Sequence, residues 1–482
     1  MHGTRMWTSL PQRQRSLILF ALLSFALLIK CIWPLFVYHI PLGYDVGIYR
    51  YLFVRHADGF PPFDVVALPA WAKGHPLGLF FVTTILIRLG IPADWLIGWI
   101  WNLFPVFLAI LLGWVMMRRE GKTVGLLTML AALLSVAYFD GFAAMYWKTL
   151  ASLFWCVLTY HLLERRSWIA VITGILTVAT HHQTGLLFGL AFGSWVIVGL
   201  FKAWIFERRF PREILLPLIG GVIVLAVGLL WYLPVWKEAV MQNLPELFAG
   251  EGSPGGNFPP ASFYLSTSGI LLALGAVGLL VSLKRERFTL WQWSVLWCLL
   301  FVSLRLFFFR RFFLQLDFFL LPFAAIAIHF FWKRYPQFIA RSVLVLAVGI
   351  QLIVTSITIA TRKPAIDAAT YATLPALAEI VPPGATIIDP ENQSPPFLQG
   401  WLPYAHVAGP GLFETTWSYD QWKTFIVGSH TDRLHLLQPL GNDTYVYISP
   451  YFRNYYGAFA DSFLADSCFS RQTDALYKVV CK

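Results

Sequence analysis

A short polar motif, Pro41-Leu-Gly-Tyr-Asp-Val-Gly-Ile-Tyr-Arg50, directly follows the first long apolar segment of the chain, residues 17–37. It places one carboxylate, Asp45, between a glycine-tyrosine turn and a tyrosine-arginine pair. A carboxylate beside a bilayer is costly unless it is hydrated, paired or bound to a cation, so the motif suggests a site. The simpler alternative is an acidic turn residue at a membrane–water boundary. The rest of the sequence has to decide between the two.

The composition is that of a polytopic membrane protein. Of the 482 residues, 58% are hydrophobic and 13% are charged, whereas soluble domains carry roughly 25% charged residues. The chain therefore lacks the polar residues to cover itself in water. Its net charge of +11 would suggest nucleic acid in a soluble protein. Here the excess of Lys and Arg in cytoplasmic loops explains most of it, and we expect no nucleic-acid partner.

Apolar segments predict eleven transmembrane helices, since a bilayer core takes about 20 helical residues. The candidate segments are 17–37, 94–117, 123–139, 146–163, 168–181, 184–204, 214–235, 263–283, 289–309, 313–332 and 339–360. The apolar run 76–89 is shorter and bracketed by Gly and Pro. We expect it to form a helix lying on or dipping into the outer leaflet.

The distribution of basic residues supports the odd number of spans. With the N-terminus in the cytoplasm as an uncleaved signal anchor, the cytoplasmic segments hold 18 Lys and Arg, and the longer outer loops before the last span hold 9. Treating 76–89 as a full span would reverse every later loop and place the basic clusters outside. The sequence thus predicts a multi-pass plasma membrane protein whose C-terminal region is extracytoplasmic.

Two domains are expected. Residues 1–361 form the transmembrane module, with 38–93 as its first outer loop, and residues 362–482 form a small extracytoplasmic α/β domain. The elements expected in that domain are a helix at 368–380, a turn at 382–384 and strands at 385–389, 445–448 and 475–480. Cys468 and Cys481 are close enough in sequence to close a short hairpin. A disulfide there would need an oxidising compartment.

The unusually placed polar residues all fall at the predicted outer face. They are Asp45 in the first outer loop, Asp140 at the end of the third span, Lys148 beyond it, His181 and His182 between the fifth and sixth spans, and Arg310 and Arg311 before the tenth. We expect them to converge on one pocket. Arg310 and Arg311 oppose the inside bias, which favours phosphate binding over snorkelling anchors.

Simpler alternatives stay open for these residues. Asp140 could cap a helix within an Asp-Gly turn. His181 and His182 could be a hydrogen-bonding pair at the interface, or ligands of a metal if an acid joins them. Asp317 is most simply the partner of Arg305 or Arg311.

Two acidic motifs resemble those of the GT-C superfamily of membrane glycosyltransferases, which includes oligosaccharyltransferases, protein O-mannosyltransferases and aminoarabinose transferases. The segment 43–50 is similar to the first acidic motif, in which Asp45 is the catalytic or metal-binding carboxylate. The segment 135–142 is similar to the second, with Asp140 as its acid, but Phe142 stands where the oligosaccharyltransferase form has a further acid. His75, in Lys73-Gly-His-Pro-Leu-Gly78, lies near the place of a second acid in mannosyltransferase-like members.

The resemblance implies transfer of a sugar from a polyprenyl-phosphate-linked donor to an extracytoplasmic glycan, lipid or protein. Residues assigned to the donor phosphate are Arg310, Arg311, His181, His182 and Lys148, and those assigned to the loop and acceptor are Tyr44, Tyr49, Arg50 and His75. Asp45 and Asp140 are the expected catalytic acids. With His182 they would be the ligands of a divalent cation such as Mg or Mn, if one is needed.

Two other functions are compatible with the sequence. A transporter or flippase for lipid-linked sugars would show charged or broken-helix residues near mid-membrane and inverted repeats, whereas the charges here gather at one face. A non-catalytic GT-C-like protein of envelope assembly would have degenerate motifs, and Phe142 keeps that alternative open.

Overall fold

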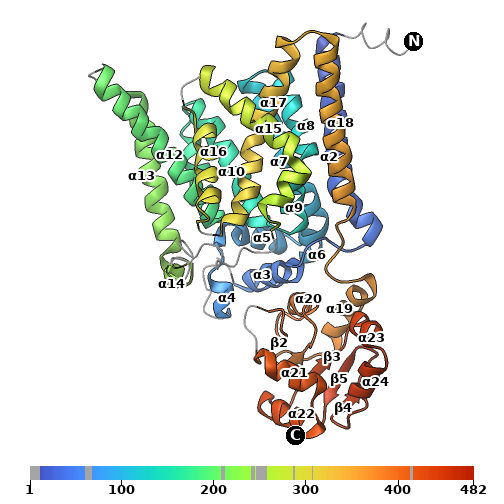
Figure 1. The fold of residues 1–482 in the computed structure, drawn as a ribbon. Coiled ribbons are helices and arrows are strands. Elements are labelled where there is room, and N and C mark those ends of the chain that lie inside the picture. The colour runs from blue at the N-terminus through green and yellow to red at the C-terminus, as the bar shows by residue number, and fades with distance from the viewer. Residues whose placement is uncertain are drawn as a thin grey trace. The chain divides into compact units, whose positions relative to one another are not determined.

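The computed structural model (Figure 1) describes residues 11–59, 68–207, 212–239, 241, 245, 258–285, 288–306, 308–412 and 416–481. It divides into two compact units. The bundle unit comprises Met1–Trp33, Gly74–Leu79 and Trp101–Arg362, and the α/β unit comprises Pro34–Lys73, Phe80–Ile100 and Lys363–Lys482. The predicted domain boundary lies beside this division. Most of the first loop, however, packs with the C-terminal region rather than with the transmembrane module to which we assign it from sequence.

The bundle unit is helical throughout its described elements. They are α2 (Gln12–Tyr38, shared with the other unit), α7 (Trp101–Arg119), α8 (Lys122–Leu134), α9 (Val136–Ala143), α10 (Trp147–Glu164), α11 (Ile169–Thr180), α12 (His182–Lys202), α13 (Arg212–Tyr232), α14 (Trp236–Ala239), α15 (Ala261–Arg285), α16 (Leu290–Ser303), α17 (Phe312–Arg334) and α18 (Phe338–Ala360). Of the 18 basic residues counted in the predicted cytoplasmic segments, Arg5, Arg208, Arg209 and Arg287 lie outside the described part.

Helix α17 forms the centre of the bundle. It is apolar on nearly all sides, as expected for a helix buried all round, and it packs against α8, α15, α16 and α18. Gly278 of α15 permits the closest approach, because a Cβ at that position would lie 1.7 Å from the carbonyl oxygen of Phe323. Small residues at such crossings allow helices to pack backbone to backbone in membranes.

Seven of the described helices are long and apolar enough to cross a membrane, and the bent pair α8–α9 would make an eighth. The chain is thus a multi-pass membrane protein. Helices α11 and α16 have only 12 and 14 residues, short of the roughly 20 that span a bilayer core. The count of eleven spans therefore stays a prediction.

The α/β unit contains a five-stranded sheet with strand order β2-β1-β3-β5-β4. The strands are β1 (Thr386–Ile388), β2 (His406–Ala408), β3 (Thr444–Tyr447), β4 (Phe469–Arg471) and β5 (Leu476–Val479). Strand β1 is parallel to both β2 and β3, with Thr386 opposite His406 on one side and Thr444 on the other. Strand β5 is antiparallel to β3 and β4. The three predicted strands are confirmed, and β2 and β4 are additional.

The other elements of the α/β unit are helices of the first loop and of the C-terminal region. They are α3 (Val46–Asp58), α4 (Ala70–Lys73), α5 (Leu77–Arg88, which begins in the bundle unit), α6 (Ala93–Trp95), α19 (Ala368–Ile380), α20 (Pro395–Trp401), α21 (Tyr419–Val427), α22 (His430–Leu437), α23 (Pro450–Tyr456) and α24 (Ala458–Leu464). Helix α19 confirms the predicted helix at 368–380, and its N-cap Asp367 accepts from the amide of Thr370 at 2.7 Å. The run 76–89 is helical as expected; its place along the membrane stays a prediction.

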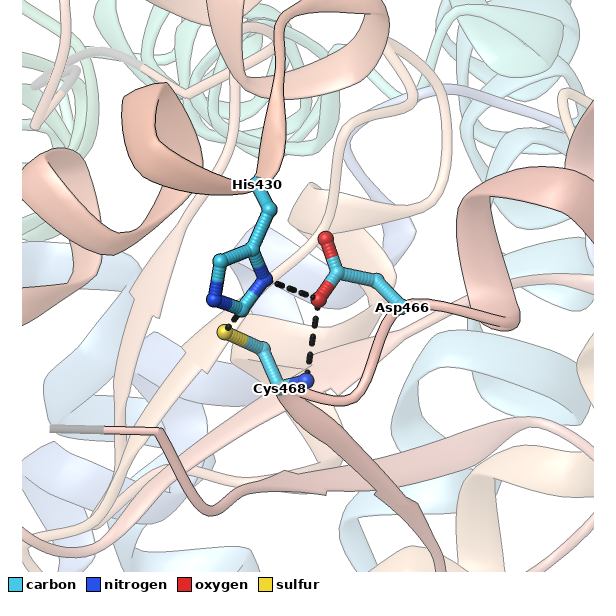
Figure 2. A group of neighbouring side chains, drawn as sticks. All are labelled: His430, Asp466 and Cys468. Atoms are coloured by element: carbon cyan, nitrogen blue, oxygen red, sulfur yellow. Dashed lines mark hydrogen bonds and ion pairs between the residues drawn. The ribbon is translucent and has the colours of Figure 1, made fainter.

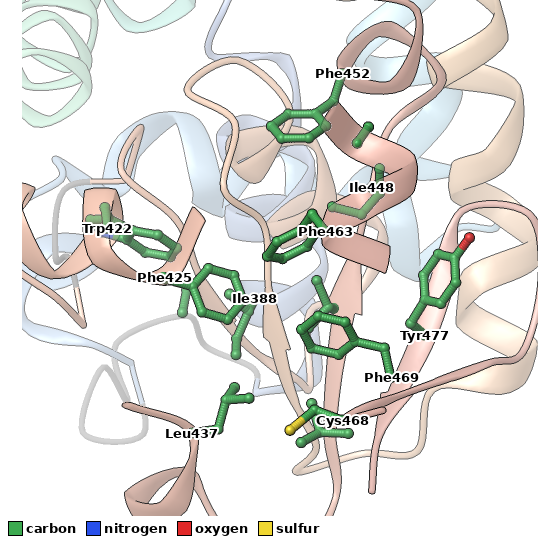
Figure 3. Packing of buried hydrophobic residues seen from close by; sticks show 14 of the residues in the cluster. Ile388, Trp422, Phe425, Leu437, Ile448, Phe452, Phe463, Cys468, Phe469 and Tyr477 are labelled. Carbon is green, nitrogen blue, oxygen red and sulfur yellow. The ribbon is translucent and has the colours of Figure 1, made fainter. Parts of the chain in front are cut away.

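An aromatic core fills one face of the sheet (Figure 3). Phe425 packs with Phe463 and Phe469, with ring centroids 5.4 and 6.4 Å away. Beside this core, Cys468 and Cys481 form a disulfide that ties β4 to the end of β5. The other cysteines of the described part are buried and free, as expected from their apolar surroundings.

Candidate functional site

The first acidic motif forms a turn that opens helix α3. Gly43 has a φ of +114°, a conformation that glycine alone adopts without strain. Asp45 takes the N-cap position of α3 with φ −82° and ψ 8° rather than the extended backbone of a capping residue. Its side chain makes no capping hydrogen bond within α3, every residue of which is described. The carboxylate of Asp45 is therefore not used to begin the helix.

The neighbours of Asp45 hold the motif to the C-terminal region. The Tyr44 hydroxyl lies 2.8 Å from the carbonyl oxygen of Asn392 and 2.6 Å from that of Gly411. Arg50 is paired with Asp94 at 2.7 Å. Tyr49 is buried and packs against Phe53. From the sequence we assigned Tyr44, Tyr49 and Arg50 to the loop and the acceptor. Their contacts hold the loop, and a role towards the acceptor stays a prediction.

Basic groups from four predicted segments come together in the bundle unit. The Lys148 ammonium at the start of α10 donates to Nδ1 of His75 at 2.5 Å. The rings of His181 and His182, in the α11–α12 turn, lie 5.2 Å apart. Lys148 and Arg311 are both near enough to interact electrostatically with the two histidines. We call His75, Lys148, His181, His182 and Arg311 the cationic cluster, after its two charged members, Lys148 and Arg311; His75 and His181 accept hydrogen bonds at Nδ1, as neutral imidazoles do.

Close helix packing and hydrogen bonds hold the cluster in place. Gly78 at the start of α5 lies against the end of α11, where a Cβ would be 2.7 Å from the backbone of Ala179. His181 is the N-cap of α12, and its Nδ1 accepts from the amide of Thr184 at 3.3 Å. The Thr184 hydroxyl in turn accepts from Gln315 of α17 at 2.8 Å. Contacts among α5, α11, α12 and α17 thus hold the cluster.

Arg310 and Arg311 precede α17 and have different surroundings. Arg311 lies over the rings of Phe308 and Tyr146, at 5.0 and 5.8 Å from their centroids. Arg310 lies over Phe309 at 6.0 Å, and its membership of the cluster stays a prediction.

An apolar cavity of about 750 Å³ lies between α12 and α13. His182 lines it together with Tyr232, Trp236 and several small residues of the two helices. His182 therefore belongs both to the cationic cluster and to the wall of this cavity.

Both carboxylate oxygens of Asp140 accept hydrogen bonds, and Asp140 forms an ion pair with Arg362. Arg362 donates from Nε to Oδ1 at 2.8 Å and from Nη2 to Oδ2 at 2.9 Å, and the Tyr264 hydroxyl donates to Oδ2 at 2.9 Å. Both oxygens of Asp140 are therefore occupied, and a new partner could reach them only by displacing Arg362 or Tyr264. Arg362 does not figure in the sequence analysis, although its position just after the last predicted span marks it as a charge at a membrane boundary.

The break between α8 and α9 is contacted by a charged residue that we did not predict, Lys30 of α2. Helices α8 and α9 are bent by 59° at Ser135, which frees the last carbonyl groups of α8. The buried Lys30 ammonium donates to Ala132, Leu133 and Ser135 oxygens at 3.0, 2.9 and 2.7 Å. A lysine inside the first apolar segment was the available signal, because intramembrane charges need partners.

Asp317 joins the same break. Its carboxylate accepts from the Ser135 hydroxyl at 2.5 Å, and Ser135 also caps α9 by accepting from the amide of Tyr138. Our expectation that Asp317 pairs with Arg305 or Arg311 is not what the structure describes. Asp317 instead contacts Ser135 at the helix break.

These contacts bear on the expected Mg or Mn site. Of the three residues named for it, Asp140 has both oxygens engaged by Arg362 and Tyr264. A cation at Asp140 would have to displace the guanidinium. Asp140 therefore does not fit the role of metal ligand.

A second group with metal-like spacing lies in the α/β unit, where His430, Asp466 and Cys468 converge (Figure 2). The thiol of Cys468 is consumed by the disulfide, and Asp466 is paired with Arg433 at 2.6 Å. Burial alone would raise the pKa of Asp466, but hydrogen bonds from the Cys468 amide, His430 and Arg433 outweigh it and lower the pKa. The group is a structural ion-pair network rather than a metal centre.

Comparison with known proteins gives matches in structure. No protein-family model matches the sequence, and no curated protein matches it in sequence. The archaeal oligosaccharyltransferase AglB from Archaeoglobus fulgidus, in complex with an inhibitory peptide and a dolichol-phosphate, is similar with a TM-score of 0.61 and 13% identity, over 93% of this chain and 71% of that one. ArnT from Cupriavidus metallidurans, bound to undecaprenyl phosphate, is similar with a TM-score of 0.59 and 14% identity, over 98% of this chain and 99% of that one.

At such low identity these likenesses establish the fold. They extend over almost the whole chain. The resemblance expected from segments 43–50 and 135–142 is confirmed at this level, without a choice between subfamilies. The chain has the fold of the GT-C membrane glycosyltransferases.

Proposed function

We propose that the protein is an integral-membrane glycosyltransferase that moves a sugar from a polyprenyl-phosphate-linked donor to a glycan, lipid or protein outside the cytoplasm. The shared fold supports the reaction class, and AglB and ArnT have been solved with dolichol-phosphate and undecaprenyl phosphate respectively. The eleven spans, the plasma membrane location and the extracytoplasmic C-terminal domain belong to this proposal.

The observation that carries the proposal is the position of His182, in the cationic cluster and in the wall of the α12–α13 cavity. A polyprenyl phosphate has these two parts: an apolar chain that needs an apolar surface and a phosphate that needs cations. Lys148 and Arg311 supply positive charge for the phosphate. The same charges would stabilise the phosphate as it leaves the sugar, which lowers the barrier to transfer.

Asp45 is our candidate for activating the acceptor. A hydroxyl or amide acceptor needs a carboxylate to orient it or to remove its proton. Asp140 is a weaker candidate for this role because Arg362 and Tyr264 engage both of its oxygens. We assign Asp140 to the support of the bundle and Asp45 to the chemistry. If a divalent cation takes part, its ligands would have to be sought apart from Asp140.

The broken α8–α9 helix and the buried Lys30 are features that a transporter could also show. In this chain the Lys30 ammonium is engaged by three backbone oxygens, and Asp317 by the Ser135 hydroxyl. Such contacts stabilise a fixed helix break, so they favour a structural role over an ion or substrate path. A non-catalytic GT-C-like assembly protein would keep the fold and lose turnover, which an assay decides.

Binding of undecaprenyl phosphate to the purified full-length protein in detergent tests the donor site. Lys148→Met should weaken binding about tenfold or more, because a hydrogen bond to a charged group contributes about 1.5–3 kcal/mol. Lys122→Met, which removes a lysine at the exposed start of α8, is the matched control and should bind as the wild type does. Equal binding by the Lys148 variant would remove the cationic cluster from the proposal.

A further inference from the structure

The C-terminal sheet has an edge of the kind at which α/β domains bind ligands. Strand β1 lies between its parallel neighbours β2 and β3, so the carboxyl ends of the three strands lie along the same edge of the sheet. In open α/β sheets, ligands bind outside the carboxyl ends of the strands. The segments at that edge are 389–394 after β1, 409–412 after β2 and 448–449 after β3.

A residue of the chain itself occupies this edge. The Tyr44 hydroxyl is within hydrogen-bond distance of the carbonyl oxygens of Asn392, after β1, and Gly411, after β2. Only glycine fits beside it, since a Cβ on residue 411 would lie 2.5 Å from the Tyr44 hydroxyl oxygen. The side chain that precedes Asp45 is therefore held between two loops of the sheet.

A buried acid network fixes the loop that receives Tyr44. Asp389 accepts from the Ser394 hydroxyl at 2.5 Å and from the amide of Glu391 at 3.0 Å. Glu391 accepts from the hydroxyl of Ser449, which follows β3, and its Oε2 lies 3.0 Å from the Ser394 hydroxyl oxygen. The loop 389–394 is thus tied to two strands.

A second contact holds the motif on the other side of Asp45. Helices α3 and α20 cross at Gly47 and Gly400, where a Cβ on Gly47 would lie 2.0 Å from the carbonyl oxygen of Pro396 and one on Gly400 would lie 2.5 Å from the carbonyl oxygen of Gly47. Arg50 donates to the Gly400 carbonyl at 2.6 Å and covers the ring of Trp401 at 4.7 Å. The backbone of α3 has almost no freedom to shift along α20.

We propose that the C-terminal domain is a clamp that positions Asp45, and that its ligand-binding edge has been taken over by the protein's own first loop. Tyr44 fixes the residue before Asp45, and Gly47 and Arg50 fix the helix that begins after it. Tyr44, Gly47, Arg50 and Gly400 are then positioning residues for the acceptor carboxylate. This inference rests on the proposed function for the role of Asp45, whereas the clamp itself is a property of the fold.

Two substitutions test the clamp in the full-length protein. Gly400→Ala inserts a methyl group into the α3–α20 crossing, and Tyr44→Phe removes only the hydroxyl. The control for the first is Gly59→Ala, because a Cβ at Gly59 has no atom within 4 Å. The control for the second is Tyr419→Phe, whose ring is 83% exposed.

Hydrogen exchange of the α3 amides is the readout that does not depend on activity. We expect Gly400→Ala to speed exchange over residues 46–58 by about tenfold or more and Tyr44→Phe by a few-fold, with the controls unchanged. In a transfer assay both should lower kcat while KM for the lipid donor stays the same, because the donor site is not altered. If Gly400→Ala does not fold, the exchange and kcat of Tyr44→Phe alone decide whether the clamp exists.

The outcomes separate the clamp from the proposed function. Unchanged α3 exchange in Tyr44→Phe, or loosened α3 with an unchanged kcat, would overturn the clamp. If the wild type transfers no sugar while the exchange results hold, the proposed function fails and the structural role of the clamp stands.

Discussion

The two acidic motifs resemble each other in the sequence and differ in the structure. Each places an aspartate near the end of an apolar segment, followed within two residues by a glycine. Asp140 is buried and engaged by Arg362 and Tyr264. Asp45 sits at a helix start that it does not cap, and its neighbours Tyr44 and Arg50 hold the loop in place. The Asp140 carboxylate stabilises the packing of the bundle, whereas contacts with the C-terminal region position the motif that contains Asp45.

The difference shows what a buried charge costs in a membrane protein. A carboxylate removed from water must be paired, and the oxygens that make the pair are not available to bind an acceptor. Asp140 is paired in this way, so we assign it to stabilising the bundle rather than to catalysis. A site for acceptor activation is better served by Asp45, whose motif is fixed by hydrogen bonds from Tyr44 and Arg50.

Breaking the Asp140 pair should give the largest change in stability. Asp140→Asn leaves the Arg362 guanidinium partly buried without a counter-charge, at a cost of about 2–4 kcal/mol. We expect a clearly lower midpoint of thermal unfolding for the full-length protein in detergent. In a double-mutant cycle, Arg362→Met should cost much less in the Asp140→Asn background than in the wild type. Additive effects, or a wild-type midpoint for Asp140→Asn, would show that the ion pair does not support the bundle.

The buried acids Asp389 and Glu391, in the loop that receives Tyr44, should give a smaller change in stability, and that change should depend on pH. Burial first, and then the charge of Glu391, raises the pKa of Asp389 well above its usual value. The folded pKa thus exceeds the unfolded one, so Asp389 favours the folded state at low pH and this contribution is lost as pH rises from about 4 through the folded pKa. Glu391, whose pKa is also raised by burial, acts in the same direction.

Asp389→Asn removes the buried charge while keeping the size of the side chain. We expect the full-length variant to unfold about 2–4 °C higher than the wild type at pH near 8 and to show less loss of stability between pH near 5 and 8. Asp432→Asn is a control on an exposed residue of the same unit and should leave the pH profile nearly unchanged. A wild type that is equally stable at both pH values would contradict the burial of a raised-pKa carboxyl.

Much of the fold follows from local patterns in the sequence. Apolar segments predicted the membrane character. In the C-terminal domain, the helix at 368–380 and the strands around Ile387, Val446 and Tyr477 follow from apolar runs between turns. Strands β2 and β4 were missed because three-residue strands, flanked by Pro, Gly and polar residues, carry little periodicity. The span count was less secure because α11 and α16 are shorter than a bilayer needs.

The candidate site was predictable in part. Several of the basic residues singled out from the sequence lie near one another in the bundle unit, namely His75, Lys148, His181, His182 and Arg311. Their place at the outer face stays a prediction. Their partners in distant segments were not predictable, because pairings such as Asp140 with Arg362 depend on which helices touch. The role of Tyr44 and Arg50 was hidden for the same reason: their contacts, Asn392 and Gly400, are some 350 residues away.

The central claim is that Asp45 performs the chemistry while the cationic cluster binds the donor. It is tested most directly by measuring the release of lipid phosphate from a labelled polyprenyl-phosphate sugar, with wild type and Asp45→Asn side by side. We predict that Asp45→Asn loses turnover by about 100-fold or more, as expected for removal of a general base. Its affinity for undecaprenyl phosphate and its unfolding midpoint should stay at wild-type values. Normal turnover in Asp45→Asn would contradict the account.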